Sequence, residues 1–365
     1  MSLPRSILIS IIWIFILFFI VFLSRNPSYF PYSYEKDSID PQSISILWHL
    51  SNFDGVHYQN IATRGYITSF QTNFFPLYPL LINIFGNLFQ RSYLIAGILI
   101  SLLSLLGSVT ILRKLSKSPH TIILFLLFPT SFFLISGYTE SLFIFLSLFV
   151  WYQYKSKNYI LATVFGIFLS ATRYYGILLL PMILVDFFFK LKPVERFKLK
   201  SYLQLFPFLF LPVGLLTYMA FLKFQFNNPF QFHTALAMWH KSDFTFPLQT
   251  LFRYMKIFTS VPIQTVIFWV AFLEFASFIL GIYAAYIFLK ARQYSYSFYC
   301  FVGTLIPTFT GTLQSQPRYL LSLFPIFLLP SIIKINKKIL FVIYLLGGLL
   351  QLVLFRLFLS GVFVS

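Results

Sequence analysis

One polar and aromatic stretch of an otherwise apolar chain holds the residues best suited to chemistry. It runs from Trp48 to Pro79 and reads WHLSNFDGVHYQNIATRGYITSFQTNFFPLYP. It contains Asp54, one of only nine acidic residues in the chain of 365. A carboxylate with a reference pKa of about 3.9 is ionised at neutral pH and can take a proton from an attacking hydroxyl group. Asp54 is therefore the candidate general base.

The residues around Asp54 leave two interpretations open. Gly55 follows directly, which predicts a glycine-softened turn that presents the carboxylate, but Asp54 would equally well cap the next short helix. His57 lies three residues further on and would share a helical face with Asp54, where we expect hydrogen bonding rather than metal ligation. Tyr58 and Tyr78 complete the candidate substrate-binding residues of this stretch.

A second carboxylate, Glu140, lies in the run Gly137-Tyr138-Thr139-Glu140-Ser141. Thr139 would cap the following helix, and the helix dipole favours an acidic residue in its first turn. Alternatively, Glu140 binds hydroxyl groups of a substrate or orients an acceptor.

Two arginines at the ends of apolar runs are candidate phosphate ligands. Arg173 follows Thr172, and Arg318 follows Pro317, which fixes the backbone before it. Arginine binds phosphate bidentately and stays charged near lipid. The competing interpretation is that both side chains only snorkel to the membrane surface.

Trp239 and Glu274 are weaker candidates. Trp239 suits a contact with a sugar or a lipid phosphate, although an interfacial aromatic belt looks the same. Glu274 lies within an apolar run, where an ionisable residue is a functional candidate unless a hydrogen bond inside the helix bundle explains it. No spacing typical of a metal site, a phosphate loop or a nucleotide-sugar site occurs, so the sequence identifies no certain cofactor; a divalent metal stays open as an alternative that no motif supports.

The elements that position these residues are membrane helices. The chain is 58% hydrophobic and 10% charged, with a mean hydropathy of +0.81. We predict one all-α, polytopic membrane domain over residues 1–365, with about eleven spans, some of them broken or re-entrant. Its single cysteine, Cys300, excludes a disulfide within the chain. The apolar runs are 6–23, 93–112, 121–135, 141–154, 158–172, 177–189, 202–222, 262–289, 298–313, 319–333 and 339–358.

The distribution of charge predicts the topology. The net charge of +18 is dispersed between apolar runs, so it marks cytoplasmic loops rather than a nucleic-acid surface. With the N-terminus inside, two long stretches face outward, 24–92 and 223–260, and we expect interfacial helices in the first of them. Most of the acidic residues then lie outside, namely Glu35, Asp37, Asp40, Asp54, Glu140 and Asp243.

Five motifs in order between Trp48 and Pro325 resemble the PIG-V mannosyltransferase family, within the GT-C superfamily of membrane glycosyltransferases. The motifs are Asp54-Gly-x-x-Tyr58 with Ile61-Ala62 and Gly65-Tyr66; Phe74-Phe75-Pro76-Leu77-Tyr78-Pro79; Phe128-Pro129-x-Ser131-Phe132-Phe133 leading to Gly137-Tyr138-Thr139-Glu140-Ser141; Thr172-Arg173-x-x-Gly176; and Pro317-Arg318-Tyr319-Leu320.

The resemblance implies an inverting transfer of a sugar, usually mannose, from a polyprenyl- or dolichyl-phosphate donor to a lipid-linked or glycan acceptor on the outer face. It implies that Asp54 is the base and that cations such as Arg318 stabilise the leaving lipid phosphate. Eukaryotic family members add the second mannose of glycosylphosphatidylinositol anchors. Because this chain is short for one of them, we expect a prokaryotic plasma-membrane homologue rather than one of the endoplasmic reticulum, and we do not carry that acceptor over.

Two other classes of protein remain as alternatives. A transporter or lipid flippase would also be polytopic, but it typically shows repeated halves with charged or broken helices near the membrane midplane. A non-catalytic scaffold subunit of a glycosylation complex would tolerate the loss of Asp54.

Overall fold

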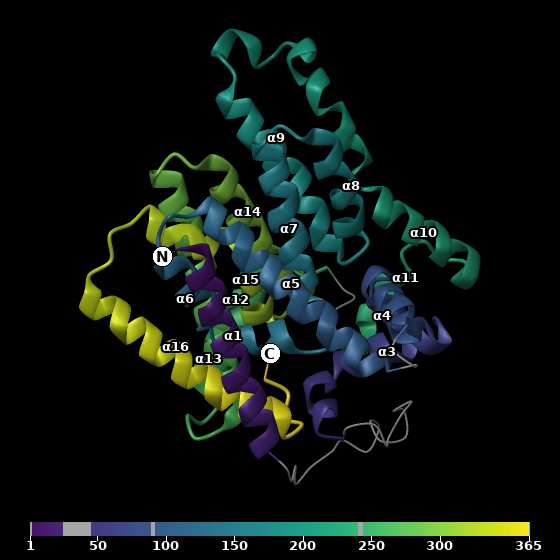
Figure 1. Cartoon of the computed structure of the whole chain (residues 1–365), viewed down its shortest axis with the longest axis vertical. Helices are drawn as coiled ribbons and strands as arrows, with labels where there is room; N and C mark the ends of the chain where they lie inside the picture. The colour runs from purple at the N-terminus through teal and green to yellow at the C-terminus, as the bar shows by residue number, and fades with distance from the viewer. Residues whose placement is uncertain (1, 25–44, 89–91, 240–243, 365) are drawn as a thin grey trace. The chain divides into compact units, whose positions relative to one another are not determined.

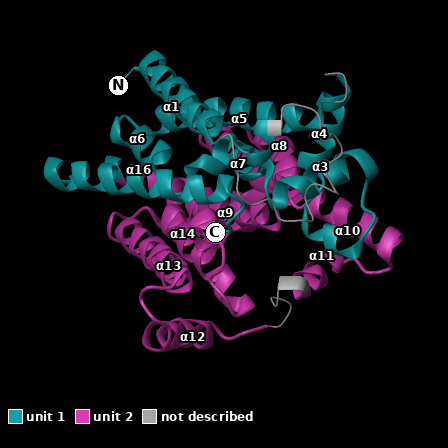
Figure 2. Cartoon of the chain, turned by 90° about the horizontal axis from the view of Figure 1, so that it is seen from below, with its two compact units in different colours: residues 1–145, 330–364 teal, residues 146–329, 365 magenta. Residues whose placement is uncertain are grey.

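The computed structural model describes residues 2–24, 45–88, 92–239 and 244–364, and their regular structure is helical throughout (Figure 1). The predicted all-α class is confirmed. The chain divides into two compact units, which are described separately below (Figure 2). Unit 1 comprises residues 1–145 and 330–364, and unit 2 comprises residues 146–329 and 365. The single membrane domain expected from the sequence stays a prediction.

Unit 1 is built around the long helix α5, which packs against α1, α3, α4 and the 3-10 helix η3. Gln351 of α16 ties α1 and α6 together: its Oε1 accepts from Trp13 Nε1 at 3.1 Å, and its Nε2 donates to the Leu126 carbonyl at 2.8 Å. The elements are α1 (Leu3–Leu23), η1 (Ser45–Ser51), α3 (Asp54–Arg64), η2 (Ser69–Asn73), α4 (Leu77–Leu88), α5 (Tyr93–Leu115), α6 (His120–Leu126), η3 (Ser131–Ile135), the start of α7 (Glu140–Lys155) and α16 (Lys337–Leu359).

Unit 2 centres on the antiparallel pair α13 and α14, against which α9 and α15 pack. Small residues allow this packing; a Cβ on Gly281 would meet the side chain of Thr304 on α14. The elements are the rest of α7, α8 (Tyr159–Ser170), η4 (Tyr174–Leu178), α9 (Leu179–Lys190), η5 (Pro193–Glu195), η6 (Leu199–Phe210), α10 (Val213–Phe226), α11 (Gln231–Thr234), η7 (Ala235–Trp239), α12 (Pro247–Ser260), α13 (Val266–Lys290), α14 (Tyr294–Leu305), η8 (Ile306–Thr310), α15 (Gln316–Ser322) and η9 (Phe324–Ser331).

Four helices of the described chain are long and apolar enough to cross a membrane: α1, α5, α13 and α16. The pair η6 and α10, bent by 42°, would make a fifth span. Other predicted runs form shorter pieces. The run 121–135 is broken into α6 and η3, because a residue before a proline avoids the α conformation and Pro129 follows the end of α6. A membrane protein is supported, and the count of about eleven spans stays a prediction.

The first outer stretch has the short helices that the sequence predicts. The structure shows η1, α3, η2 and α4 in succession, with Pro79 in the first turn of α4 as expected. Their placement in the membrane interface stays a prediction. Residues 25–44, which include three of the predicted outer carboxylates, lie outside the described residues, as does Asp243.

Candidate functional site

Asp54 is the first residue of α3, and the residue before it holds an uncommon backbone conformation. Phe53 occupies the N-cap position with φ 60° and ψ −116°, which is costly for a residue with a side chain. The predicted glycine turn is therefore wrong: Gly55 lies inside the helix, and the turn is made at Phe53. The N-cap interpretation of Asp54 is also wrong, because that position belongs to Phe53.

Contacts from the end of the chain and from the 137–141 run hold the segment before Asp54. The Phe53 ring packs on Phe358 and Phe363, with centroids 6.0 and 5.5 Å away. Asn52 Nδ2 donates to the Phe358 carbonyl at 2.8 Å, and Tyr138 Oη donates to the Asn52 carbonyl at 2.5 Å. The backbone that carries Asp54 is thus fixed on several sides, which offsets the cost at Phe53.

We expect Tyr138→Phe to lower the free energy of unfolding by about 1–3 kcal/mol, because it leaves the buried Asn52 carbonyl without that donor. Thermal unfolding of the purified protein in detergent measures the change. Tyr93→Phe is the matched control, since its hydroxyl donates to Asn87 Oδ1 at 3.0 Å on the surface. Equal destabilisation by both variants would contradict the special role of Tyr138.

Two glycines let the Asp54 segment and the Glu140 segment meet. A Cβ on Gly55 would lie 2.9 Å from Ser51 Cβ and 3.3 Å from the Gly137 carbonyl oxygen, and a Cβ on Gly137 would clash with Ser51 Oγ. The Gly137 amide donates to the Leu50 carbonyl at 2.9 Å. These close approaches require glycine at both positions and bring the first turns of α3 and α7 together.

Two hydroxyl groups also join α3 to the residue directly before α7. Tyr58 Oη lies 3.2 Å from Thr139 Oγ1, and the Thr139 carbonyl accepts the first helical hydrogen bond of α7 from the Phe143 amide at 2.8 Å. Thr139 therefore occupies the position directly before α7, and capping of the helix by its side chain stays a prediction. The Tyr58 ring meets Tyr78 edge-on, with centroids 5.2 Å apart and planes at 89°.

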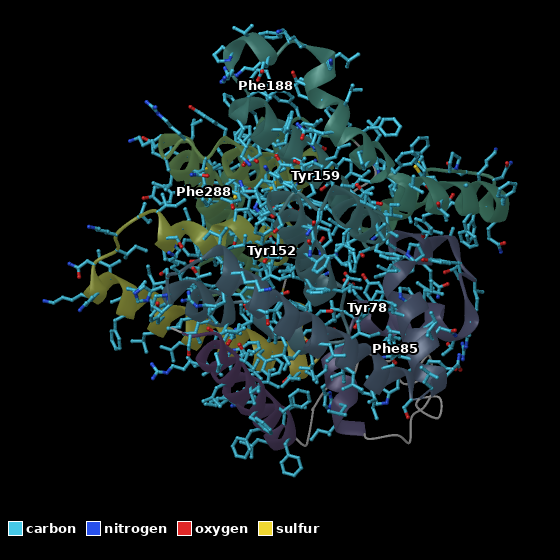
Figure 3. The ribbon with its side chains drawn as sticks, turned by 45° about the horizontal axis from the view of Figure 1, so that its top comes forward. Tyr78, Phe85, Tyr152, Tyr159, Phe188 and Phe288 are labelled. Carbon is cyan, nitrogen blue, oxygen red and sulfur yellow. The ribbon has the colours of Figure 1, made fainter. Side chains whose placement is uncertain are left out.

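Tyr78, labelled in Figure 3, is wholly buried, and its contacts link α4 to this group. Its hydroxyl donates to the Gly97 carbonyl at 2.9 Å and lies 3.1 Å from Ser101 Oγ. Burial raises the pKa of Tyr78 far above its usual value, the Ser101 hydrogen bond opposes this, and charge interactions with Tyr58 and Glu140 raise it further. Tyr58, Tyr78 and Glu140 therefore share one neighbourhood in unit 1.

The two candidate carboxylates differ in access to solvent. Glu140 is fully buried at the start of α7, whereas Asp54 is partly exposed. Asp54 is thus the carboxylate of this pair that keeps exposed surface, and substrate contacts of both Asp54 and Glu140 stay predictions.

The two histidines near Asp54 are in aromatic or buried surroundings. The His57 ring packs between Phe70 and Phe74, with centroids 4.9 and 4.8 Å away, and its hydrogen-bonding role stays a prediction. Burial lowers the pKa of His49 below its usual value of 6.5, so His49 is neutral at physiological pH.

In unit 2, an aromatic stack joins the two segments that carry the candidate arginines. The rings of Tyr175 in η4 and Tyr319 in α15 lie parallel within 10°, with centroids 5.3 Å apart. Arg318 precedes Tyr319 and is only 7% exposed. Burial raises the pKa of Tyr175, charge interactions with Tyr174 and Tyr319 raise it further, and the positive charge of Arg173, two residues earlier in the chain, opposes that rise. The structure therefore brings together the two segments that carry the arginines, although they are far apart in the sequence, and phosphate binding by either arginine stays a prediction.

The two remaining candidates of unit 2 are Glu274 and Trp239. Glu274 Oε2 accepts a hydrogen bond of 2.5 Å from Tyr254 Oη, which in turn accepts from the Leu313 amide at 2.9 Å. The interpretation of Glu274 as a hydrogen-bonding residue within the bundle is confirmed. Trp239 ends η7, but its side chain lies outside the described residues.

A model of the family described as Mannosyltransferase (PIG-V) matches residues 33–276 of the chain. The chain belongs to the PIG-V mannosyltransferase family. The match includes Asp54, Glu140 and Arg173, whereas Arg318 lies beyond it, so the correspondence of Arg318 to a family motif stays a prediction.

A curated protein gives a weaker similarity. GPI alpha-1,6-mannosyltransferase 2 of Cricetulus griseus is 32% identical over 127 residues. This stretch covers 30% of the present chain and 26% of the hamster protein, so the match spans about a quarter of that relative's length. No solved structure matches this PIG-V family member.

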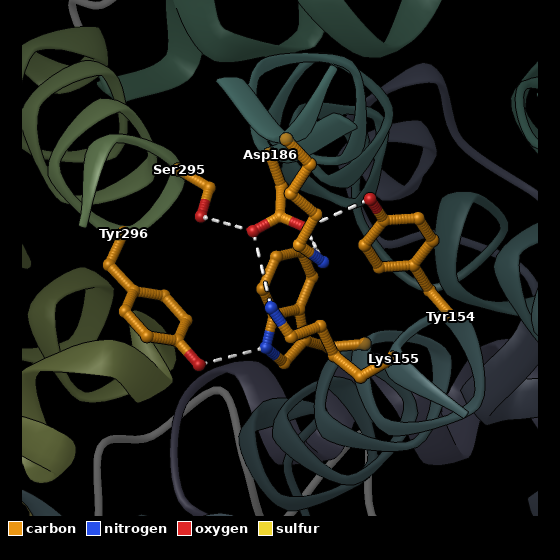
Figure 4. A network of polar contacts seen from close by, with 7 residues as sticks. Tyr154, Lys155, Asp186, Ser295 and Tyr296 are labelled. Atoms are coloured by element: carbon orange, nitrogen blue, oxygen red, sulfur yellow. Dashed lines mark hydrogen bonds and ion pairs between the residues drawn. The ribbon is translucent and has the colours of Figure 1, made fainter. Parts of the chain in front are cut away.

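Sequence reasoning missed the residues that support the site of this PIG-V family member. Asn52 and Tyr138 hold the backbone before Asp54, and Ser51 lies against both Gly55 and Gly137; the paired glycines at 55 and 137 were the available signal. It also missed a polar cluster around Asp186 in unit 2 (Figure 4), which Lys190 at i+4 could have indicated. Among the residues that the structure describes, no three His, Cys, Asp or Glu side chains are grouped to hold a metal ion.

Proposed function

We propose that this PIG-V family member transfers mannose from a polyprenyl- or dolichyl-phosphate donor to a lipid-linked or glycan acceptor on the extracytoplasmic face, with inversion and with Asp54 as general base. The observation that carries the proposal is the partly exposed Asp54 carboxylate, held at the start of α3 inside the segment that matches the family.

In this mechanism the acceptor hydroxyl gives its proton to the Asp54 carboxylate while its oxygen attacks C1 of the sugar. Attack comes from the face opposite the phosphate, so the anomeric configuration inverts. The bond between C1 and the phosphate oxygen breaks, and its electron pair leaves with the lipid phosphate. The proposal assigns binding of that phosphate to Arg173 and Arg318, because guanidinium groups stabilise developing negative charge on phosphate oxygens.

Different observations support the choice of mannose and the choice of a lipid-phosphate donor. The name of the family and that of the hamster relative both support mannose. The sequence contains none of the motifs that bind a nucleotide sugar, which favours a lipid-phosphate donor. The acceptor is proposed only as a class, because the match covers a quarter of the hamster protein.

Purified chain reconstituted in liposomes with a lipid extract of its host tests the donor. We expect label to move from radiolabelled polyprenyl-phosphate mannose to an extractable glycolipid or glycan, and none to move from labelled GDP-mannose. Transfer from GDP-mannose alone would contradict the proposed donor. Flipping of labelled glycolipid without any transfer would favour the transporter alternative instead. Parallel reactions with a chelator establish the metal requirement.

A further inference from the structure

A short segment of unit 2 presents basic and apolar side chains to the outside together. Residues 191–200 connect α9 to the start of η6, and we name them the basic–apolar loop. It holds four basic residues and one acidic residue, Glu195. Its apolar side chains are nearly as exposed as those of an unfolded chain: Val194 is 76%, Phe197 89% and Leu199 83% exposed.

The loop has a defined conformation, which Arg196 secures. The Arg196 guanidinium lies over the rings of Phe188 and Phe189, 5.2 and 5.7 Å from their centroids, and its Nε donates to the Leu191 carbonyl at 3.3 Å. Tyr202 Oη donates to the Arg196 carbonyl at 2.8 Å. Arg196 is thus occupied within the loop, while Lys192, Lys198 and Lys200 point outward and are exposed.

A polar cluster anchors the end of α9 just before the loop (Figure 4). Asp186 forms ion pairs with Lys190 at 2.6 Å and with Lys155 of α7 at 3.2 Å. It also accepts hydrogen bonds from Tyr154 at 2.9 Å and from Ser295 of α14 at 3.3 Å. The cluster has one carboxylate and two lysines, so its net charge is positive. It therefore adds to the positive charge of the loop instead of neutralising it.

We propose that the basic–apolar loop is a docking surface for the anionic phospholipid headgroups of the membrane that holds this protein. Apolar side chains this exposed on an anchored loop mark a binding surface. Lysines interleaved with such side chains suit an anionic lipid surface, where the cations meet the headgroups and the apolar tips enter the boundary with the acyl chains. The sequence-based topology puts this loop on the cytoplasmic side, where anionic lipid is found.

Binding of a fluorescent short-chain phosphatidylglycerol to the purified full-length protein in detergent tests the proposal. We expect saturable binding that phosphatidylglycerol displaces and phosphatidylcholine does not. The triple variant Lys192→Gln/Lys198→Gln/Lys200→Gln should bind at least tenfold more weakly, because each lysine near an anionic lipid surface contributes about fivefold. Arg196 is kept in this variant because its contacts hold the loop together.

The matched control removes the same charge elsewhere. Arg64, Lys223 and Lys256 are also exposed, and Arg64→Gln/Lys223→Gln/Lys256→Gln should bind phosphatidylglycerol as the wild type does. An equal loss in both triple variants, or equal displacement by phosphatidylcholine, would overturn the proposal.

A second measurement examines the apolar tips and does not depend on the lysine variants. An environment-sensitive dye on Val194→Cys reports the polarity around the loop, since the native Cys300 is buried and does not compete for the label. In nanodiscs that contain phosphatidylglycerol, we expect the emission of the attached dye to be blue-shifted relative to the emission of the free dye in water. Emission typical of water in the nanodiscs would show that the tips lie outside the bilayer and would contradict the lipid surface in favour of a soluble partner.

Discussion

Asp54→Asn is expected to lower mannose transfer by about 10²–10⁴-fold, the range that general base catalysis contributes. The amide has almost the same shape as the carboxylate but accepts no proton at neutral pH. Because Asp54 is partly exposed and its backbone is held by contacts of Asn52 and Phe53, we expect the variant to fold normally. The rate of transfer from polyprenyl-phosphate mannose measures the loss.

The pattern of the loss separates catalysis from binding. A base acts in the transition state, so kcat should fall while the KM for the donor changes little. Glu195→Gln is the matched control: it removes another exposed carboxylate, in unit 2, and should leave the rate unchanged. Equal transfer by Asp54→Asn and the wild type would refute the base assignment and would favour the scaffold alternative.

The sequence was sufficient for the class of fold because that class depends on local composition. Long apolar runs require helices, and the limits of α5, α13 and α16 follow the predicted runs closely. Broken spans were expected, but the positions of the breaks were not predicted. Hydropathy averages over a window and does not register that Pro129 ends α6, or that η6 and α10 meet at a bend of 42°.

The candidate base was found from its type and place in the chain, but its surroundings were not. The turn was assigned to Gly55 on local propensity, whereas the structure makes it at Phe53, which has a positive φ. Phe53 keeps that conformation through rings at 358 and 363, some three hundred positions away along the chain. Contacts this distant in sequence leave no local signal, so tertiary packing overrode the propensity.

The arginines of unit 2 show the same limit. Each was picked out as a basic residue at the end of an apolar run, but nothing in either run indicates the other. The stack of Tyr175 on Tyr319 is what relates them. Adjacent tyrosines in the two motifs were visible in the sequence, yet tyrosine is frequent in this chain and carried no information by itself.

The close contact of α3 with α7 leads to a second large expected effect. Gly137→Ala should lower mannose transfer by about 10²-fold, because its new Cβ would clash with Ser51 Oγ and push the segment before Asp54 out of place. The Ser51 hydroxyl does not rotate away freely, since Gln59 Nε2 donates to it at 3.0 Å. The backbone of Ser51 leads directly into Asn52 and Phe53, so the shift reaches Asp54 within three residues.

The clash predicts its own rescue. In Ser51→Ala/Gly137→Ala the offending oxygen is gone, and the nearest atom to the new Cβ is Ala Cβ at the Ser51 Cβ position, an ordinary 3.4 Å away. We expect this double variant to recover most of the activity, less the effect of losing the Gln59 hydrogen bond, which Ser51→Ala alone measures. Gly348→Ala is the control for the substitution itself. A Cβ on Gly348, which lies in α16, would have its nearest neighbour, Leu127 Cδ2, 3.8 Å away. A double variant as inactive as Gly137→Ala would show that the glycine acts by some route other than its contact with Ser51.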